Sequence, residues 1–407
     1  MNIWIINPYG ELPTGEWREY RSYMLAKELA RNGHEVTWWI SNFDHRAKKY
    51  RDNKSDELII EPGLKCISVP STAYYKNISI RRILYEINFG KNLIKMSKFQ
   101  IKPDLIVLGY PAIFTGGPIF QLKRELSIPL ILDVIDLWPE LFEVALPNFL
   151  KPFSRFIFSP LYRIRKNQVN SSDGVVAVSC NYRDVAMNEA TVKIKSEVVY
   201  LGLEMSTKND SLLDGLINDQ VSLFRDKFSI IAVYAGTLGD AYDMDLLLDA
   251  ANFVKESDLS VGFIVAGNGP RYKDFESKGG SIDNLLFLGL LPAKQLASLY
   301  SYCDVGLMTY VPGSTVAMPV KLFDYLAAGL AILNCLGRDV GDITVLEGVG
   351  LNYKASNIND FIEKLQVFSD DRGLLNSCKA ASKNIAQKYE VNSQYSLFRS
   401  FIESYER

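Results

Sequence analysis

The fold is decided by residues 230–270, IIAVYAGTLGDAYDMDLLLDAANFVKESDLSVGFIVAGNGP. The apolar run Ile230–Ala235 predicts a buried strand, and the apolar spacing of Met244–Val254 predicts a helix. A second apolar run, Val261–Ala266, predicts the next strand. A strand, a helix and a strand in succession are typical of a parallel sheet covered by helices.

The same alternation fills the rest of the chain. Asn2–Asn7 predicts a strand, Glu16–Asn32 an amphipathic helix that ends at Gly33, and Val36–Ile40 the next strand. Further strands are expected over 105–108, 130–134, 174–178, 198–201, 285–288, 305–308 and 331–334. Further helices are expected after 178 to about 190, and over 117–126, 293–301, 321–328, 359–368 and 391–407. Such alternation over two stretches indicates an α/β protein with two doubly wound, Rossmann-like domains.

The length and one change of composition indicate where the domains divide. A chain of 407 residues exceeds what a single core usually supports. Residues 205–220 are rich in Ser, Asn and Asp and poor in large apolar side chains. We predict an N-terminal domain over 1–203, a linker over 204–222 and a C-terminal domain over 223–390. The last helix, 391–407, could pack back on the N-terminal domain. Ligands are expected in a central cleft where the carboxyl ends of both sets of strands meet.

Composition excludes several classes of protein. A hydrophobic fraction of 48% with 23% charged residues is ordinary for a globular protein and excludes disorder. The five cysteines are odd in number and widely spaced, so neither a disulfide framework nor a zinc site is indicated, and a cytoplasmic location is expected. We expect no signal peptide, because no basic region precedes Asn2–Asn7. The uncharged stretch Leu105–Leu122 contains five Gly and Pro residues, which argue against a membrane span.

The net charge of −2 conceals an asymmetry. The first 200 residues hold 27 basic and 21 acidic side chains, and the remainder hold 18 and 26. Two segments, Tyr74–Lys102 and Asn148–Asn170, combine the basic excess with aromatic and aliphatic residues. Such segments are attracted to an anionic bilayer surface, although a solvated basic face over ordinary core residues gives the same pattern. Nucleic acid is not expected as a partner, because no recognition motif accompanies the charge.

The strongest candidate for ligand chemistry is the expected start of a helix at Lys321. A helix start offers free N–H groups and a positive dipole end, and Lys321 adds a full charge, so this position suits a phosphate. Asp324 follows three residues later, where it could accept a hydrogen bond from a ribose hydroxyl. Glycine turns follow the two strands of the opening stretch, in AGTLG at 235–239 and AGNGP at 266–270, and would let a ligand approach the backbone closely. The loop GELPTGEW, 10–17, follows the first strand in the same way.

The segment DVIDLWPE, residues 133–140, places three carboxylates and a Trp–Pro pair at a strand end. Burying a carboxylate there costs free energy unless it is paired with a cation or takes part in binding or catalysis, and we favour a role in binding or catalysis. Asp136 could orient or deprotonate an acceptor hydroxyl. The two histidines suggest little: His34 follows the glycine that ends a helix and is expected to be structural, and His45 lies in a basic loop and is expected to be solvated.

Together these residues resemble the family 4 retaining glycosyltransferases of the two-domain GT-B fold. The resemblance extends over the whole chain. It rests on GHEV at 33–36, DLWPE at 136–140, AGTLG at 235–239, AGNGP at 266–270, FLGLLPAKQLASLYSYCDVGLM at 287–308 and MPVKLFDYLAAGLAIL at 318–333. The DLWPE form is similar to the branch that makes bacterial surface polysaccharides, in which the acceptor is often lipid-linked at the inner face of the membrane.

The resemblance implies roles for individual residues. Asp324 would hold the donor ribose, and the helix start would contact the donor sugar and its diphosphate. The residues expected to bind the donor are Gly15, Gly236, Thr237, Gly267, Asn268, Gly269, Leu290, Leu291, Met318, Pro319, Val320, Lys321 and Asp324. Asp136 and Trp138 are expected to contact the acceptor, and Asp136 and Lys321 are the expected catalytic residues. No metal or other cofactor is expected, because the nucleotide-sugar is itself a substrate.

The sequence departs from the family pattern at four positions. The family usually has an Arg and a Lys, five residues apart, on the donor diphosphate, and these positions are Thr237 and Tyr242 here. Val316 replaces the earlier acid of the E-x7-E pattern, and Ile135 replaces the usual active-site His. The positive charge on the leaving group would then come from Lys321, from the helix end or from basic residues elsewhere.

We therefore expect a glycosyltransferase that moves a hexosyl or N-acetylhexosaminyl group, with retention, from a UDP- or GDP-linked donor. The expected acceptor is a glycan or a polyprenyl-linked glycan of bacterial surface polysaccharide synthesis, reached from the cytoplasm through peripheral contact with the inner membrane. Two alternatives remain open: a UDP-sugar epimerase of the same architecture, and a non-catalytic protein that binds nucleotide-sugars. Product formed from donor alone would favour the first, and binding without turnover would favour the second.

Overall fold

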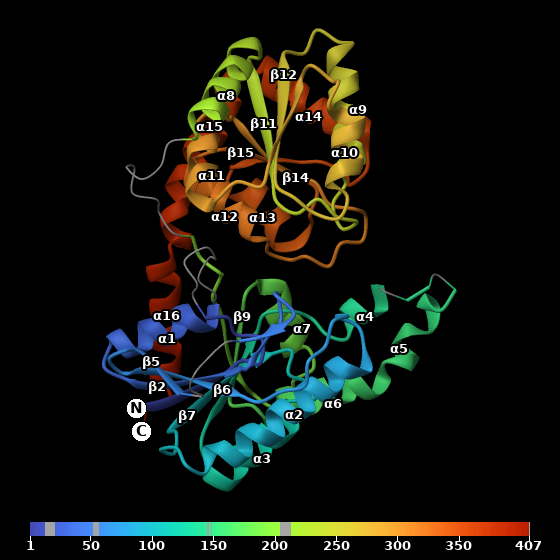
Figure 1. Cartoon of the computed structure of the whole chain (residues 1–407). Coiled ribbons are helices and arrows are strands. Elements are labelled where there is room, and N and C mark those ends of the chain that lie inside the picture. Colours follow the sequence, from blue (N-terminus) through green and yellow to red (C-terminus); the bar gives the residue numbers. More distant parts are fainter. Residues whose placement is uncertain (13–20, 52–56, 145, 148, 204–212, 407) are drawn as a thin grey trace. The chain divides into compact units, whose positions relative to one another are not determined.

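A computed structural model describes residues 1–12, 21–51, 57–144, 146–147, 149–203 and 213–406. The chain forms two compact units (Figure 1). The first consists of Met1–Tyr200 with Gln394–Arg407, and the second of Leu201–Ser393. The C-terminal segment therefore belongs to the first unit, although it follows the second in the sequence.

The first unit is built on one mixed sheet with the strand order β10-β9-β8-β7-β1-β2-β6-β5. The antiparallel edge strand β5 pairs with β6, and the other strands are parallel to their neighbours. The strands are β1 (Asn2–Ile6), β2 (Glu35–Ser41), β5 (Glu57–Glu61), β6 (Leu64–Val69), β7 (Leu105–Tyr110), β8 (Leu130–Val134), β9 (Gly174–Ala177) and β10 (Lys195–Val198), with a separate ribbon of β3 (Phe43–Asp44) and β4 (Lys49–Tyr50).

Helices pack around this sheet. The longest, α2, starts at the N-cap Ser79, whose side chain accepts a hydrogen bond from the backbone N–H of Arg82. The helices are α1 (Arg21–Arg31), α2 (Ile80–Ser97), α3 (Gly116–Leu126), α4 (Glu140–Val144), α5 (Ser154–Ile157), α6 (Ser159–Ser171), α7 (Cys180–Met187) and α16 (Val391–Glu403), with the 3₁₀ turn η1 (Lys151–Phe153).

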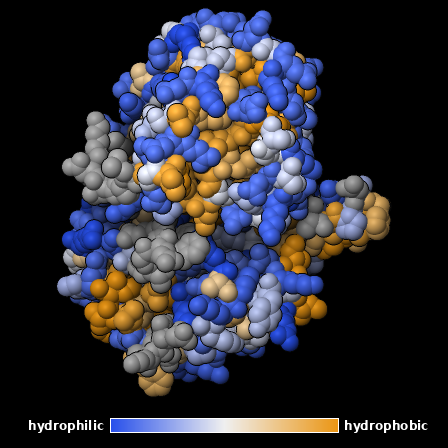
Figure 2. Space-filling view, turned by 45° about the horizontal axis from the view of Figure 1, so that its top comes forward, coloured by the Kyte–Doolittle hydropathy of each residue, from blue (hydrophilic) through white to orange (hydrophobic). Residues whose placement is uncertain are grey.

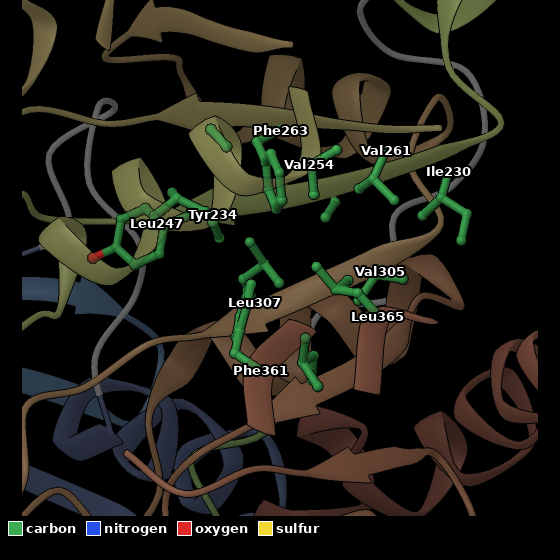
Figure 3. Close-up of a cluster of buried hydrophobic side chains, with 14 of the residues drawn as sticks. Ile230, Tyr234, Leu247, Val254, Val261, Phe263, Val305, Leu307, Phe361 and Leu365 are labelled. Carbon is green, nitrogen blue, oxygen red and sulfur yellow. The ribbon is translucent and has the colours of Figure 1, made fainter. Parts of the chain in front are cut away.

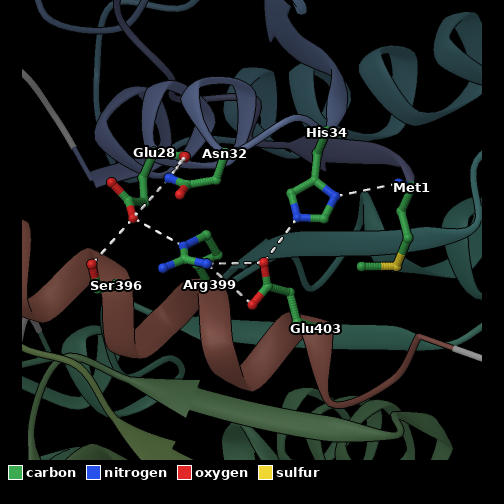
Figure 4. A network of polar contacts seen from close by, with 7 residues as sticks. All are labelled: Met1, Glu28, Asn32, His34, Ser396, Arg399 and Glu403. Carbon is green, nitrogen blue, oxygen red and sulfur yellow. Dashed lines mark hydrogen bonds and ion pairs between the residues drawn. The ribbon is translucent and has the colours of Figure 1, made fainter.

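The helix α16 is held against α1 by a polar network (Figure 4). Arg399 donates to Glu28 on α1 at 3.0 Å and to Glu403 on its own helix at 3.1 Å. His34 lies between Glu403, at 3.1 Å, and the N-terminal amine of Met1, at 3.3 Å. These contacts give His34 the structural role expected from the sequence.

The second unit has a parallel sheet in the order β13-β12-β11-β14-β15-β16. The chain starts in the middle, winds to one edge and then returns to wind to the other, which is the doubly wound topology. Its strands are β11 (Ile230–Ala235), β12 (Val261–Ala266), β13 (Leu285–Gly289), β14 (Val305–Met308), β15 (Ala331–Asn334) and β16 (Gly350–Asn352). Its helices are α8 (Gly215–Lys227), α9 (Met244–Lys255), α10 (Tyr272–Gly279), α11 (Ala293–Tyr300), α12 (Val320–Ala328), α13 (Arg338–Leu346), α14 (Ile358–Asp370) and α15 (Arg372–Ala386), with η2 (Gln387–Tyr389).

A continuous core joins the sheet of the second unit to its helices (Figure 3). Val261 and Phe263 of β12 and Leu307 of β14 meet Leu247 of α9 and Phe361 of α14. All five side chains are almost fully buried. Since both strands are apolar along their whole length, the sheet is covered on both faces, as parallel sheets are.

The prediction of an α/β protein with two doubly wound domains is confirmed. The predicted linker, 204–222, was wrong in its second half, because helix α8 begins at Gly215. That helix buries only Val221 and Phe224, and its exposed side chains include Leu216 and Leu223 as well as polar residues. The strand expected over 198–201 ends at Val198. No helix in the described ranges is long and apolar enough to cross a bilayer, and Leu105–Leu122 divides into β7, a turn and part of α3.

Candidate functional site

Two glycine turns interlock at the carboxyl end of the second sheet. Gly236 and Gly267 follow β11 and β12 with φ angles of +149° and +150°, which favour glycine. Gly236 N–H donates to the carbonyl of Ala266 at 2.9 Å, and Leu238 N–H donates to that of Asn268 at 3.0 Å. A Cβ atom on Gly267 would lie 1.8 Å from the carbonyl oxygen of Gly236. Glycine is therefore required for the two loops to pack together, whether or not a ligand is bound.

A third loop joins them through Gly289. Gly267 N–H donates to the carbonyl of Gly289 at 2.6 Å, which brings the end of β13 to the same place. Of the two leucines predicted to line a nucleotide, Leu290 is 75% exposed and Leu291 is buried. Asn268 is exposed, and its side-chain oxygen accepts a hydrogen bond from Gly269 N–H. Leu290 and Asn268 are therefore accessible to a ligand at this edge of the sheet.

The helix start predicted to bind phosphate is present. Helix α12 begins at Val320 after the N-cap Pro319, which supplies no capping side chain. Met318 is buried, Val320 is 38% exposed, and Asp324 is half-buried on the first turns of the helix. Without a side-chain cap, the positive end of the helix dipole at Val320 is not screened by a neighbouring acceptor.

Lys321 is enclosed by three tyrosine rings. Its Nζ atom lies 4.0 Å from the ring centroid of Tyr234, 4.6 Å from that of Tyr242 and 5.3 Å from that of Tyr310. The side chain is 9% exposed, and among the described residues no atom accepts a hydrogen bond from Nζ. A Cβ on Gly236 would lie 3.0 Å from Nζ, so the amine reaches the glycine turn after β11. We call Lys321 and these three rings the lysine cage.

The electrostatics of the cage favour an anion. Burial lowers the pKa of Lys321 to about 7, and the nearby Cys335 and Asp324 oppose this shift. The faces of the tyrosine rings attract an ammonium, but they carry no net charge. A buried cation without a counter-charge is costly. An anionic ligand placed beside Nζ would supply that counter-charge.

The cage lies where the topology of the sheet predicts a ligand. The strand order reverses between β11 and β14, which are hydrogen-bonded neighbours. Tyr234 is on β11, Tyr310 follows β14, and Lys321 is on the helix that comes next. Open α/β sheets bind ligands at the carboxyl ends of the strands at this switch point.

The cage also accounts for one departure from the family pattern. Tyr242 stands where the resemblance leads us to expect a lysine, and its ring faces the amine of Lys321 instead. Thr237, at the position of the expected arginine, is exposed. In this chain a cation reaches the same loop from α12. The sequence indicated Lys321, but the three tyrosines come from separate segments, and no local pattern connects them.

Two of the three carboxylates in 133–140 have structural partners. Asp133 is buried, and both of its oxygens accept from Nε of Arg21, at 2.8 and 3.0 Å. Glu140 forms an ion pair at 2.6 Å with the buried Arg165, which also pairs with Glu189. Of these three carboxylates, Asp136 is therefore the one that we still expect to contact a substrate.

Asp136 lies in a partly buried aromatic setting. Burial raises the pKa of its carboxyl group, and a backbone hydrogen bond from Leu137 and the charge of Arg82 oppose that shift. The ring of Trp138, expected to contact the acceptor, is instead 3% exposed, because it packs against the guanidinium of Arg82, 4.2 Å from its centroid, and against Phe142. A carboxylate with a raised pKa beside an aromatic ring and a cation can orient or deprotonate a sugar hydroxyl.

Further polar residues lie at the switch point of the first sheet, between β1 and β7. Tyr9 donates to Glu86 at 2.6 Å, and Arg82 Nε donates to the hydroxyl of Tyr9 at 3.1 Å. Burial raises the pKa of Glu86. No local sequence pattern indicates these residues, because Tyr9 and Glu86 are far apart along the chain and α2 is marked in the sequence by its basic residues.

His45 corrects another expectation. It is half-buried, its Nδ1 contacts the hydroxyl of Tyr74, and burial lowers its pKa to about 4. The expectation of a solvated histidine was wrong because the loop that carries it folds over the aromatic residues Phe43, Tyr74 and Tyr85. Gly15, predicted to lie near the diphosphate, is outside the described residues. Within the described ranges, no group of His, Cys, Asp and Glu side chains could hold a metal ion.

Two doubly wound domains with glycine loops and a cationic helix start agree with the GT-B fold that the sequence resembles. The family model described as Glycosyltransferase Family 4 matches residues 19–206, and that described as Glycosyl transferases group 1 matches residues 229–371. The chain belongs to the family 4 glycosyltransferases. Comparison with curated proteins finds no match.

Solved structures share the fold at low sequence identity. The chain is similar to sucrose-phosphate synthase from Thermosynechococcus elongatus, with a TM-score of 0.75 at 14% identity over 99% of both chains. It is similar to Anabaena HepE in complex with UDP-glucose, with a TM-score of 0.64 at 14% identity over 99% of this chain and 100% of the other. It is also similar to WaaG, a glycosyltransferase involved in lipopolysaccharide biosynthesis, with a TM-score of 0.63 at 13% identity over 98% and 99%.

Proposed function

We propose that this glycosyltransferase uses a UDP-linked sugar as donor and binds the donor diphosphate beside Lys321. The observation that carries the proposal is the lysine cage: a buried amine without a partner among the described residues, at the switch point of the second sheet. A diphosphate would supply the counter-charge that the cage lacks. Similar folds have been determined with UDP-glucose and with UDP-2-fluoro glucose, which supports uridine as the base.

In this proposal, the second unit stabilises the leaving group. The bond between the anomeric carbon and the β-phosphate oxygen breaks, and negative charge grows on that oxygen. Lys321 and the free N–H groups at the start of α12 are fixed in position, so they stabilise that charge without reorganising. Asp324 holds the ribose in this arrangement. The reaction is proposed to proceed with retention and without a metal, because Lys321 and the helix supply the positive charge.

The first unit is proposed to bind the acceptor. Asp136, which is only partly buried, orients or deprotonates the hydroxyl that attacks the anomeric carbon. The carbon–oxygen bond to that hydroxyl forms as the hydroxyl loses its proton. We propose a glycan or lipid-linked glycan of bacterial surface polysaccharide synthesis as acceptor and the cytoplasmic face of the inner membrane as its location.

Release of UDP measures this function directly. The purified protein is incubated with UDP-sugars and GDP-sugars, with and without lipid-linked acceptors, and nucleotide release is followed together with transfer of a labelled sugar. Lys321→Met should reduce transfer at least 100-fold, because it removes the only charge that the proposal places on the leaving group. Lys255→Met is the matched control, since that lysine is half-exposed on α9, and it should leave transfer unchanged.

Three results would contradict the proposal. Full transfer by Lys321→Met would show that the cage does not contact the diphosphate. A new sugar nucleotide formed from donor alone would identify an epimerase. Saturable UDP-sugar binding with no product from any acceptor would identify a non-catalytic binding protein.

A further inference from the structure

The first unit exposes an unusual number of large apolar side chains on one segment. Phe149, Phe153 and Phe156 are 74%, 62% and 83% exposed, and Ile157 is 42% exposed. They lie between α4 and α6, on the part that extends away from the sheet of this unit (Figure 1). Figure 2 shows apolar side chains gathered on the same projecting part, at the right of the molecule. We call the described segment 149–158 the phenylalanine lobe. Isolated apolar residues are common on protein surfaces, but a cluster of this size indicates a contact surface.

The charge around the phenylalanine lobe has a single sign. Residues 149–172 contain no Asp or Glu. Four cations in this range are exposed, Lys151, Arg155, Arg163 and Lys166, whereas Arg165 is buried and already paired. Exposed aromatic residues flanked by exposed cations are complementary to a bilayer with anionic headgroups, which takes up the rings and attracts the charges.

A second segment of the same character lies beside the lobe. Before and within the first turns of α2, Tyr75, Ile78 and Ile80 are 69%, 58% and 77% exposed. Lys76 and Arg81 are exposed among them. The two exposed segments therefore have the same composition, and both belong to the first unit.

A row of stacked side chains connects the two segments. The guanidinium of Arg82 on α2 lies 4.2 Å from the ring centroid of Trp138. The ring of Trp138 lies 4.9 Å from that of Phe142 on α4, which lies 5.9 Å from that of Phe158. The start of α2 and the phenylalanine lobe are thus joined by one row of packed side chains, in which Trp138 is buried.

We propose that the phenylalanine lobe and the start of α2 form the surface by which this protein docks on an anionic bilayer, and that this surface delivers an amphiphilic acceptor to Asp136. The acceptor would keep its lipid in the bilayer and place its sugar beside this carboxylate. The second half of this proposal rests on the proposed function, which assigns acceptor contact to Asp136. The first half does not, because vesicle binding requires no donor.

Vesicle sedimentation tests the surface. The full chain, without nucleotide, is mixed with vesicles of phosphatidylcholine alone or with 30% phosphatidylglycerol, at low salt and at 0.5 M NaCl. The wild type should sediment with the anionic vesicles and be released from them by salt, because screening removes the electrostatic part of the attraction. Phe153→Ser/Phe156→Ser should weaken the partition coefficient at least tenfold, because it removes two of the three most exposed rings of the lobe.

Matched controls separate docking from general surface effects. Phe99→Ser removes a phenylalanine that is 88% exposed beyond the other end of α2, and it should change vesicle binding less than twofold. Lys151→Glu/Arg155→Glu should abolish the preference for anionic vesicles and leave the melting temperature unchanged. The phenylalanine double variant should also keep its melting temperature and its affinity for UDP.

Several outcomes would overturn the proposal. One is a wild type that stays in the supernatant with anionic vesicles, and another is equal sedimentation of the wild type and the phenylalanine variant. A third is a change of oligomeric state of that variant without vesicles, which would assign the surface to a second copy of the chain. If the phenylalanine variant loses vesicle binding but still transfers sugar to an acceptor embedded in vesicles, the proposal that this surface delivers the acceptor is contradicted. If UDP is not bound while vesicle binding persists, the proposed function fails and the docking surface stands.

Discussion

Arg21 and Lys321 are both buried cations, and they differ in what surrounds them. Arg21 is 4% exposed and donates to both oxygens of the buried Asp133 and to the carbonyl of Val199. Lys321 is 9% exposed, its amine faces three tyrosine rings, and no atom of the described residues accepts a hydrogen bond from it. A cation with its counter-charge in place stabilises the fold, whereas a cation without one is ready for an anion from outside. The comparison separates a structural charge from a functional one without reference to any relative.

The largest expected effect is the loss of stability when Arg21 is replaced. Arg21→Met should destabilise the first unit by about 3–5 kcal/mol, because it leaves the Asp133 carboxylate buried without its partner. Urea denaturation followed by circular dichroism measures the change. The double variant Arg21→Met/Asp133→Leu should recover most of the loss. A single variant as stable as the wild type would show that the pair is not a structural charge.

Lys321→Met should raise the free energy of unfolding, whereas Arg21→Met should lower it. Removing a buried charge that lacks a partner should stabilise the second unit by roughly 1–3 kcal/mol at pH 7 without ligand. The pKa of Lys321 is lowered from 10.5 to about 7 on folding, so the unfolded chain binds more protons between these values. Wild-type stability should therefore rise with pH over this window, and the advantage of the variant should be greatest below pH 7.

Denaturation of both proteins at pH 6.5 and pH 9 measures this difference. A variant less stable than the wild type at both values would mean that the amine has a partner in solution and that the contrast with Arg21 is wrong. Lys255→Met, at a half-exposed site, provides the baseline for losing one lysine.

Proton uptake should accompany binding of the diphosphate. At pH 8 the free protein holds Lys321 mostly neutral, because the pKa of this group is about 7. An anion at Nζ favours the charged form, so binding should take up a fraction of a proton. Calorimetry of UDP binding in Tris and in HEPES, whose ionisation enthalpies differ, measures this fraction. Lys321→Met should show no such uptake, and equal uptake by both proteins would assign the proton to another group.

The smallest expected effect concerns the cage wall. Tyr242→Phe keeps an aromatic face beside Nζ and should change UDP affinity less than twofold. Tyr242→Leu removes the attraction between ring and ammonium, about 0.5–1 kcal/mol, and should weaken binding about two- to fivefold. A larger loss in the phenylalanine variant than in the leucine variant would show that the hydroxyl, and not the ring, matters at this position.

The sequence supports the fold more securely than the site. The runs Ile230–Ala235 and Val261–Ala266 and their glycine turns could be predicted, because strand period and backbone freedom are local properties. The lysine cage could not be predicted, because the rings of Tyr234, Tyr242 and Tyr310 meet only once the strand order is known. His45 was misjudged for the same reason, since its burial depends on residues far away in the sequence.

The carboxylates of 133–140 show a second limit. Asp133, Asp136 and Glu140 are equivalent in the sequence, and their partners Arg21 and Arg165 lie far from them along the chain. The structure separates two carboxylates that are paired with arginines from Asp136, whose carboxylate accepts a hydrogen bond from the backbone N–H of Leu137. The expected helix start indicated Lys321 in the sequence, but its burial without a hydrogen-bond partner among the described residues is a property of the folded chain.

Titration calorimetry with UDP and with uridine tests the central claim most directly. The two ligands differ by the diphosphate, which the account places beside Lys321. We predict that the wild type binds UDP at least 30-fold more tightly than uridine, and that Lys321→Met lowers UDP affinity to near that of uridine while uridine binding is unchanged. Equal UDP affinity in the wild type and in Lys321→Met would contradict the account.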